Sequence, residues 1–471
     1  MACKELNRRT YAASILKSSA ALALPWPRIT PAESSSLLRL ELTGESPGEV
    51  PKDFIGLGYE MLSVATPGLL STSNHRYLEL VRGLGRNGVI RMGGIVADYT
   101  RYLRDGTAMD DCKNTVITHR RLEEFAAFLE VTGWSAIWSV NFAQGTIDQA
   151  VDEARAVSEV LGANLLAIEL GNEVENYGRS QPFRPNPYTY EAYRREFDEW
   201  HAAIIAAVPG IRFAGPDTAQ SLEWVERIAT DAGGKIQPLT THYYRNGQRH
   251  GSEEQLLASD PRLEEVLVRL RAASRQSTIP WRMCEINSFS GGGLLGVSDT
   301  FIGTLWTLDT MLRLAQHGCS GLNLETGGNQ LGFVSSYSPI QDDGHGVNSA
   351  GAPYYGMLAF VRASAGCHQM FLLKSGPLGE GISAFAFGAD GKPRSVVIVN
   401  RSKASVHVPV GDLGIKQASV LRLTAPFAHS KTGVRFGDAF VDADGRWKSK
   451  SREKLHDACI LVPAMNAVVL R

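Results

Sequence analysis

A short apolar stretch followed by a helical pattern recurs through residues 51–351, and this rhythm constrains the fold more than any other feature of the chain. Eight of the apolar stretches have the length of a buried strand: 54–60, 89–93, 136–141, 165–171, 211–215, 238–243, 281–286 and 321–325. Eight strand–helix units in about 300 residues predict an α/β fold, the (β/α)8 TIM barrel, whose active residues lie at the carboxyl ends of the strands. A doubly wound open sheet has the same alternation and is the alternative fold.

The clearest helix is predicted over residues 147–161. Its apolar residues recur at helical spacing and form one face of the helix. Thr146 directly precedes the helix, and Gln149 lies three positions after Thr146. This spacing is the sequence signature of a capping box. Gly162 comes directly after the last apolar position and indicates where the helix ends.

The two ends of the chain have a different pattern. Residues 352–471 contain short runs of β-branched and apolar residues, punctuated by turn signals such as Ala389-Asp390-Gly391. This pattern predicts an antiparallel β-sandwich as a C-terminal domain after the barrel of residues 51–351. Residues 34–50 include an alternating stretch at 37–43, and we predict that this N-terminal strand belongs to the same sandwich.

Residues 1–33 have the pattern of an export signal. Arg8 and Arg9 stand before a mildly apolar stretch at 11–24, which resembles a twin-arginine signal of bacteria. An amphipathic tail is the alternative, because Lys17 interrupts the apolar stretch. The signal predicts an exported protein, periplasmic or secreted, and a bacterial source.

The composition excludes several classes of protein. The chain has 471 residues, 44% of them hydrophobic and 21% charged, which is ordinary for a globular enzyme and not for a disordered protein. A formal net charge of -1 gives no sign of a basic surface for nucleic acid. No stretch of about 18 uninterrupted apolar residues is present, so no membrane span is predicted.

No metal or cofactor motif is found. The six cysteines include no CxxC pair, and we predict that His242 and Cys284 are structural residues and not metal ligands. The segment Gly83-Leu84-Gly85-Arg86-Asn87-Gly88 has the letters of a dinucleotide fingerprint. That fingerprint must follow a strand and begin a helix, whereas here a helical stretch precedes it and a strand follows. We therefore expect a helix-to-strand loop and no cofactor.

Two glutamates stand where apolar strands end. Glu173 follows the fourth predicted strand through Gly171-Asn172, and Glu285 ends the stretch from Pro280 to Cys284 in the seventh. A charge at the end of a buried strand must be paired or used in chemistry. Around a closed barrel the two carboxyl groups would enter one cleft. The alternative is that each forms a buried ion pair with an arginine such as Arg91 or Arg282.

Two carboxyl groups in one cleft are what glycoside hydrolysis requires. One must be protonated to release the leaving oxygen, and the other must be ionised to attack or stabilise the anomeric carbon. Burial and the mutual field of two such groups can assign these different roles.

The chain resembles the glycoside hydrolases of clan A, in which Asn-Glu follows the fourth strand and a Glu ends the seventh. It is most similar to family 79, which holds β-glucuronidases and heparanase. The resemblance rests on Glu285 and the five residues that lead into the run Gly291-Gly292-Gly293, and on two further segments, 53–60 and 89–94. The family also combines a barrel with a sandwich built from both chain ends.

The resemblance implies a retaining, exo-acting β-glucuronidase without cofactor or metal. Glu173 would be the general acid/base and Glu285 the nucleophile. The substrate-binding residues would be Asn172 for the sugar 2-hydroxyl, Tyr243 or its neighbour Tyr244 for the nucleophile with Tyr243 preferred, Glu60 for ring hydroxyls, and Gly291, Gly292 and Tyr337 for the uronate carboxylate. The partner would be a glucuronide-containing glycoside or polysaccharide, with no nucleic acid and no membrane.

The sequence departs from the family at Ser290, where an aromatic residue commonly precedes the glycine run. A neutral β-glucoside or β-xyloside is therefore the alternative substrate. A carbohydrate-binding protein without turnover is the alternative from a different class.

Overall fold

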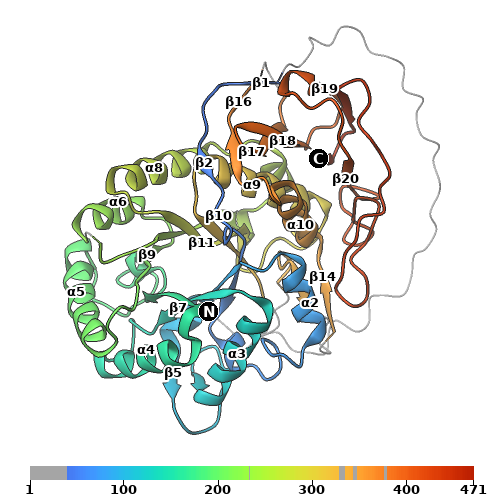
Figure 1. The fold of residues 1–471 in the computed structure, drawn as a ribbon. Helices are drawn as coiled ribbons and strands as arrows, with labels where there is room; N and C mark the ends of the chain where they lie inside the picture. The colour runs from blue at the N-terminus through green and yellow to red at the C-terminus, as the bar shows by residue number, and fades with distance from the viewer. Residues whose placement is uncertain (1–39, 233, 328–334, 343–346, 376–378) are drawn as a thin grey trace.

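The computed structural model describes residues 40–232, 234–327, 335–342, 347–375 and 379–471. Figure 1 shows a barrel with helices around it, beside a region of β-sheets formed mainly by the C-terminal part of the chain. The predicted export segment 1–33 lies outside the described residues. Within those residues no helix has both the length and the apolar character that crossing a membrane requires.

The barrel consists of eight parallel strands in the order β8-β7-β4-β3-β12-β11-β10-β9. A parallel bridge between Ile168 and Phe213 places β8 beside the segment that leads into β9, so the sheet closes on itself. This confirms the TIM barrel and excludes the open sheet. The strands are β3 Gly56–Glu60, β4 Val89–Gly93, β7 Ser135–Val140, β8 Leu165–Leu170, β9 Gly215–Thr218, β10 Leu239–Gly247, β11 Trp281–Ser290 and β12 Gly321–Glu325.

The fifth strand lies further along the chain than predicted. The apolar pattern indicates 211–215, whereas β9 covers Gly215–Thr218. Asp217 and Thr218 are both fully buried in this strand. Asp217 forms an ion pair with Arg91 at 2.5 Å, and the hydroxyl of Thr218 lies 3.0 Å from that of Thr241. An apolar pattern does not reveal a strand whose inward side chains are polar and pair with one another.

Helices surround the barrel, with α4, α5, α6 and α8 on its outer side in Figure 1. The helix predicted at 147–161 is α4, and its capping box is present: the Gln149 amide donates to Thr146 Oγ1 at 3.3 Å and the Thr146 amide donates to Gln149 Oε1 at 3.0 Å. The α-helices of the described chain are α1 Leu62–Ala65, α2 His75–Gly83, α3 His119–Thr132, α4 Ile147–Leu161, α5 Tyr190–Ala207, α6 Leu222–Asp231, α7 Glu253–Leu257, α8 Pro261–Ser277, α9 Phe301–Gln316 and α10 Ala352–Ser364.

The segment with the letters GxGxxG connects α2 to β4. Its glycines therefore come after a helix and before a strand, as the sequence predicts. A phosphate could not meet a helix N-terminus there, because the helix ends where the glycines begin. The dinucleotide interpretation is excluded by this order of elements.

The C-terminal strands form an antiparallel sandwich with strands from the N-terminal part of the described chain. The main sheet has the order β2-β15-β17-β18-β23-β20-β21, and the pairs β1-β16 and β19-β22 accompany it. Asp390 and Gly391, both with positive φ, form the predicted turn between β17 and β18. The strands are β1 Leu40–Leu42, β2 Gly48–Glu49, β15 Gln369–Phe371, β16 Leu373–Ser375, β17 Ile382–Ala389, β18 Lys392–Asn400, β19 Val406–Pro409, β20 Val420–Thr424, β21 Arg435–Phe436, β22 Cys459–Val462 and β23 Asn466–Leu470.

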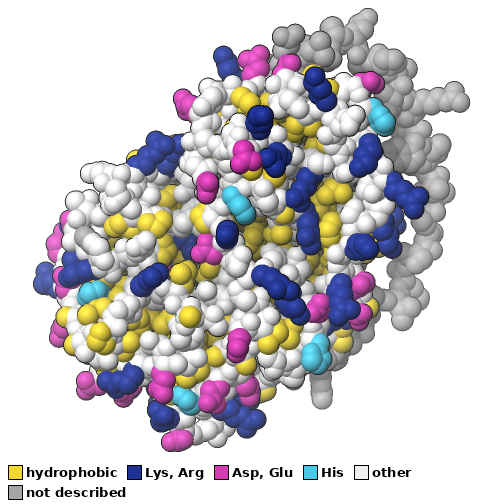
Figure 2. Space-filling view, in the orientation of Figure 1, with side chains coloured by type: hydrophobic (Ala, Val, Ile, Leu, Met, Phe, Trp, Pro, Cys, Tyr) yellow, Lys and Arg dark blue, Asp and Glu magenta, His cyan; other side chains and the backbone are white. Residues whose placement is uncertain are grey.

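Helices α9 and α10 lie between the barrel and the sandwich (Figure 1). Phe360 of α10 stacks on Phe54 at the start of the barrel, with ring centroids 4.9 Å apart. Asp309 of α9 is buried and pairs with Arg401, just after β18, at 3.1 Å. The two parts therefore share one core, which fixes the barrel mouth relative to the sandwich. On the face shown in Figure 2, acidic and basic side chains are both widely spread, in keeping with the near-neutral net charge.

Candidate active site

Four carboxyl groups converge at the mouth of the barrel. Glu60 ends β3, Glu173 follows β8, Glu285 lies in β11 and Glu325 ends β12. All eight strands are parallel, so their carboxyl ends lie at the same edge. The sequence predicts three of these groups at the site and does not single out Glu325.

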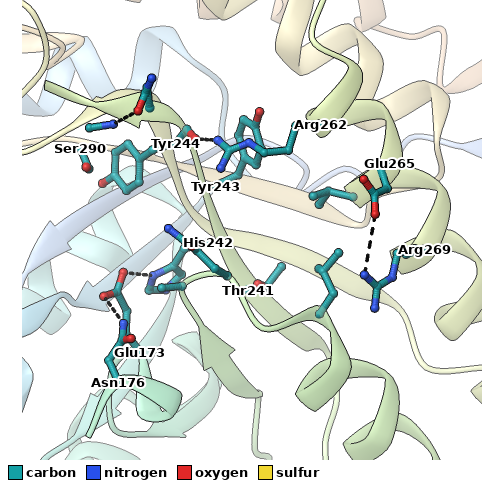
Figure 3. Close-up of a pocket in the computed structure, with 16 residues that line it drawn as sticks. Glu173, Asn176, Thr241, His242, Tyr243, Tyr244, Arg262, Glu265, Arg269 and Ser290 are labelled. Carbon is teal, nitrogen blue, oxygen red and sulfur yellow. Dashed lines mark hydrogen bonds and ion pairs between the residues drawn. The ribbon is translucent and has the colours of Figure 1, made fainter. Parts of the chain in front are cut away.

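Glu173 is the more exposed member of the predicted catalytic pair, with 25% of its side chain accessible. Its backbone has a φ of 51°, in the left-handed region, and its amide donates to the carbonyl of Asp217 at 2.8 Å. Glu173 Oε2 accepts from Asn176 Nδ2 at 3.3 Å, and Oε1 lies 3.3 Å from His242 Nδ1. Figure 3 shows both contacts, which hold the carboxyl group at the edge of a cleft.

Glu285 is more deeply placed, with 12% of its side chain accessible. Its Oε1 accepts from the hydroxyl of Tyr244 at 2.7 Å, and its Oε2 accepts from Arg91 Nη1 at 2.8 Å. One carboxylate oxygen of Glu285, one of Glu173 and a ring nitrogen of His242 all lie within 4.8 Å of one another. The two predicted catalytic carboxyl groups are therefore neighbours across one small space.

Arg91 of β4 organises the floor of the site and is fully buried. Besides Glu285, its guanidinium donates to Asn172 Oδ1 at 2.8 Å, to Asp217 Oδ2 at 2.5 Å and to Glu169 Oε2 at 3.3 Å. Burial opposes the charge, but the three carboxylates outweigh it and raise the pKa of Arg91 well above its ordinary value. Arg91 thus forms the ion pair with Glu285 that the sequence offers as an alternative, yet Glu285 stays beside Glu173.

The same guanidinium fixes the orientation of Asn172. Because Oδ1 accepts from Arg91, the Nδ2 group of the amide points away from Arg91 and can donate to another group. Asn172 is 2% exposed and directly precedes Glu173. This orientation is the one that donation to a sugar hydroxyl needs.

His242 lies between Asp217 and Glu173. Its Nε2 is 2.8 Å from Asp217 Oδ1, and its Nδ1 faces Glu173 Oε1 and, at 3.8 Å, Glu285 Oε2. Burial disfavours the charged ring, but the charges of Asp217 and Glu285 outweigh it and raise the pKa of His242 well above its ordinary value. Asp217 in turn has its pKa lowered to about 2, because Arg91 and His242 outweigh its burial. An imidazolium that donates at both nitrogens fits this arrangement.

The preference for Tyr243 over Tyr244 is wrong. The Tyr244 hydroxyl contacts Glu285, whereas the Tyr243 hydroxyl donates to Asp260 Oδ2 at 2.5 Å, away from the site. Side chains alternate along a strand, so only one of two neighbours can face the barrel interior. The register between β10 and β11 shifts between Thr241 and His242, and the sequence contains no signal for that irregularity.

Replacing Tyr244 by phenylalanine should lower kcat by about tenfold to a hundredfold, because Glu285 loses a hydrogen bond from a neutral donor to a charged group. Tyr243→Phe is the matched control, since it removes a hydroxyl that contacts Asp260 and not Glu285. We expect that control to lose less than about threefold. Steady-state kinetics of both variants on one aryl glycoside check this. Equal losses would contradict the assignment of Tyr244.

Glu60 lies against the loop that follows β4. Its Oε2 accepts from the amide of Val96 at 2.9 Å. Gly94 has a φ of 70°, and a Cβ there would lie 2.1 Å from Glu60 Oε2, so glycine is required for this approach. Burial and the charge of Glu285 raise the pKa of Glu60 to about 8. At neutral pH the group can therefore donate as well as accept a hydrogen bond.

The glycine run and Tyr337 are brought together at the end of β11. Gly291 and Gly292 have φ values of 86° and 97°. The carbonyl of Gly292 accepts from the amide of Ser336 at 2.7 Å and from its hydroxyl at 2.8 Å. Tyr337 is 7% exposed, and its ring stacks on Tyr244 with centroids 6.2 Å apart. The predicted carboxylate-binding groups thus lie on adjoining segments beside Tyr244, which donates to Glu285.

Two sets of side chains among the described residues could hold a cation by their donor atoms. In the first set, Glu169, Asp217 and Cys284, both carboxylates already pair with Arg91. In the second set, Glu173, His242 and Glu285 offer oxygen and nitrogen atoms within 4.8 Å of one another. Both ring nitrogens of His242 already face carboxylates, and Arg91 already pairs with Glu285. The positive charge that these carboxylates need is therefore supplied by the protein itself.

Comparison with known proteins gives structural matches only. No sequence-family description matches the chain, and no curated protein sequence does. The fold is similar to a 4-O-α-L-rhamnosyl-β-D-glucuronidase from Fusarium oxysporum 12S, with 18% identity, a TM-score of 0.75 and coverage of 92% of this chain and 99% of that one. This chain has the fold of a glycoside hydrolase.

Other solved structures share the same fold at lower similarity. A family 51 α-L-arabinofuranosidase from Bifidobacterium longum matches with 14% identity and a TM-score of 0.67, over 93% of this chain and 99% of that one. A GH39 β-xylosidase from Caulobacter crescentus matches with 14% identity and a TM-score of 0.59, over the same shares. These likenesses agree with the clan A resemblance of the sequence, whereas none of these proteins is described as a member of family 79.

Several residues of this glycoside hydrolase fold are missed by the sequence prediction. Glu325 ends the eighth strand as Glu60 ends the first, so the rule of a charge at a strand end, applied throughout, would have found it. Glu325 is 6% exposed, and burial with the charge of Glu285 raises its pKa well above the ordinary value. Asp217 and His242 have no such signal, because each is a single polar residue near a strand that looks structural.

Proposed function

We propose that this protein is a retaining β-glycoside hydrolase with Glu173 as general acid/base and Glu285 as nucleophile. The observation that carries the proposal is the separation of the two groups, whose oxygens lie within 4.8 Å. Retaining enzymes have carboxyl groups about 5–5.5 Å apart, whereas inverting enzymes need about 6.5–9.5 Å to admit a water. Two carboxylate oxygens this close favour the retaining arrangement.

In the first step the ionised carboxylate of Glu285 attacks the anomeric carbon. The bond from that carbon to the leaving oxygen breaks, and the proton of Glu173 moves to the oxygen, so that an alcohol leaves. Tyr244 and Arg91, which hold the two oxygens of Glu285, orient the carboxylate for this attack. The product is an ester between Glu285 and the sugar.

In the second step water replaces the leaving group. Glu173, now ionised, takes a proton from the water as its oxygen attacks the anomeric carbon, and the ester to Glu285 breaks. Two inversions give net retention of configuration. His242, which contacts Glu173 Oε1, offsets the negative charge that Glu173 carries in this intermediate. Asn172 Nδ2 donates to the sugar 2-hydroxyl.

For the sugar, we propose a β-glucuronide that is cleaved from the chain end, as in family 79. Backbone amides of Gly291 and Gly292 and the hydroxyl of Tyr337 would receive the uronate carboxylate, since glycine lets an anion approach the backbone closely. The contact of Gly292 with Ser336, beside Tyr337, supports this assignment. The glucuronidase named among the structural neighbours supports it at the level of fold.

A neutral sugar is the second candidate. Ser290 lines the cleft beside Glu173 in the position where family 79 commonly has an aromatic residue. The arabinofuranosidase and the xylosidase among the structural neighbours have the same fold and are named for neutral sugars. In this case the mechanism is unchanged and the glycine run has only a structural role.

The test is hydrolysis of 4-nitrophenyl β-D-glucuronide beside the matching β-glucoside, β-xyloside and α-L-arabinofuranoside. We expect kcat/KM for the glucuronide to exceed kcat/KM for each of the other glycosides by at least about tenfold. This is the contribution expected from hydrogen bonds to the charged uronate carboxylate. Preference for a neutral glycoside would replace the leading candidate by the second. Release of nitrophenol from none of them, with binding of a sugar, would contradict hydrolysis and favour a carbohydrate-binding protein.

A further inference from the structure

A cleft of about 470 Å³ opens at one side of the catalytic pair. It lies above the carboxyl end of β10, between helix α8 and the segments that follow β8 and β9 (Figure 3). Glu173 and Tyr244 line it, whereas Glu60, Asn172, Glu285 and Glu325 do not. The cleft therefore adjoins the proposed acid/base and leads away from the residues proposed to hold the sugar.

The position of the cleft identifies what it would hold. A general acid must lie within hydrogen-bond reach of the oxygen that it protonates. The group attached to that oxygen must continue from Glu173 on the side away from the sugar. Because the cleft begins at Glu173 and ends at α8, it is where the leaving group of the substrate would lie.

The walls of the cleft favour a flat, partly apolar group. Leu222 and Val266 contribute apolar side chains, and Tyr244 contributes an aromatic ring. Asn246 and Ser290 add polar groups to the lining. Small-molecule sites commonly combine such apolar walls with a few polar groups that fix orientation.

Two arginines of α8 line the cleft, and only one of them is neutralised by a carboxylate. Arg269 pairs with Glu226 through Nε at 2.7 Å and Nη2 at 2.8 Å, and lies 4.0 Å from Glu265. Arg262 is exposed and lies over the ring of Tyr243, 4.7 Å from its centroid. It donates to the backbone carbonyls of Tyr244 and Arg245. Among the described residues, no carboxylate lies within 4.0 Å of the Arg262 guanidinium.

We propose that this cleft is the leaving-group site and that Arg262 selects aromatic leaving groups that carry a carboxylate, so that phenolic acid glycosides are favoured substrates. This proposal rests on the proposed function, since it takes Glu173 as the acid. The ring of the leaving group would lie between Tyr244 and the apolar side chains. Its carboxylate would pair with the remaining donors of Arg262, whose Nη2 donates to two backbone carbonyls and whose guanidinium lies over the ring of Tyr243.

The test compares two aryl glycosides that differ in one charge, 3-carboxyphenyl and 3-carbamoylphenyl, on the sugar that the protein hydrolyses. We expect kcat/KM for the carboxylate to be about threefold to tenfold higher at low salt, the range for a partly exposed ion pair. The ratio should fall toward one in Arg262→Gln, and it should fall in wild-type protein as salt rises. Arg275→Gln is the matched control, because Arg275 is an exposed arginine of the same helix outside the cleft.

A ratio near one in wild-type protein, or an equal ratio in wild type and Arg262→Gln, would overturn the proposal. If the ratio fell toward one in Arg275→Gln as well, the preference for the carboxylate would come from the overall charge of the helix. That result would also overturn the proposal. Failure of the proposed function is a separate outcome, recognised by absence of turnover on every nitrophenyl glycoside. In that case calorimetric binding of 3-hydroxybenzoate and 3-hydroxybenzamide decides: preference for the acid that Arg262→Gln abolishes supports the site, and equal binding overturns it.

Discussion

Glu285→Gln is expected to lower kcat/KM by about 10⁴-fold or more on every glycoside that the protein hydrolyses, because an amide cannot form the ester with the anomeric carbon. The change keeps the size of the side chain. Arg91 retains its contacts with Glu169 and Asp217, so the buried cation stays paired. The loss should therefore be in catalysis and not in folding. Steady-state release of nitrophenol measures the catalytic loss, and circular dichroism of wild type and variant checks that the fold is kept.

A stronger version of the test uses Glu285→Gly with sodium azide. Azide is small enough to occupy the space that the missing carboxyl group leaves. It would attack the anomeric carbon from the same side, with one inversion, so the expected product is the α-glycosyl azide. Turnover of Glu285→Gln within about tenfold of wild type, or recovery of a β-glycosyl azide from the glycine variant, would show that Glu285 is not the nucleophile.

The elements that carry an apolar signal could be predicted from the sequence. Helix α4 shows this at the level of single residues, because both hydrogen bonds of its capping box follow from Thr146 and Gln149. The barrel follows from eight buried strands, and seven of them lie close to the expected positions. The exception is β9, whose inward residues are polar and buried. Its strand character depends on partners such as Arg91 that lie far away in sequence.

Those residues of the candidate site that stand near the end of an apolar strand could be predicted from the sequence. Glu173 follows an apolar strand and Glu285 lies within one, and a barrel brings the carboxyl ends of its strands together whatever the details of packing. The choice between Tyr243 and Tyr244 was not predictable, because it depends on a register shift between two strands. Arg91 was foreseen as an ion-pair partner of one carboxylate. That it would hold three carboxylates and Asn172 at once depends on the three-dimensional arrangement.

The second large effect is expected for Glu173→Gln, and its size should depend on the leaving group. Glycosides with a poor leaving group need protonation as the bond breaks, and kcat/KM for these should fall by about 10²- to 10⁴-fold. 2,4-Dinitrophenolate is stable enough to leave without a proton, so its release should fall by less than about tenfold in kcat/KM. Glu285→Gln makes no such distinction between leaving groups. The two variants therefore separate the two roles.

The hydrolysis of the ester intermediate gives the same assignment independently. Without a carboxylate at position 173, water is not deprotonated, so the glycosyl ester on Glu285 should accumulate and give a burst of dinitrophenol followed by slow turnover. Azide needs no general base and should restore turnover in Glu173→Gln, yielding a β-glycosyl azide after two inversions. In Glu173→Gln the side chain keeps its size and its amide oxygen can still accept from His242 Nδ1, and the NH2 group keeps the second contact if the Asn176 amide turns its oxygen toward it. Equal losses for good and poor leaving groups, without a burst, would contradict the role of Glu173, because the loss of a proton donor must slow poor leaving groups more than good ones.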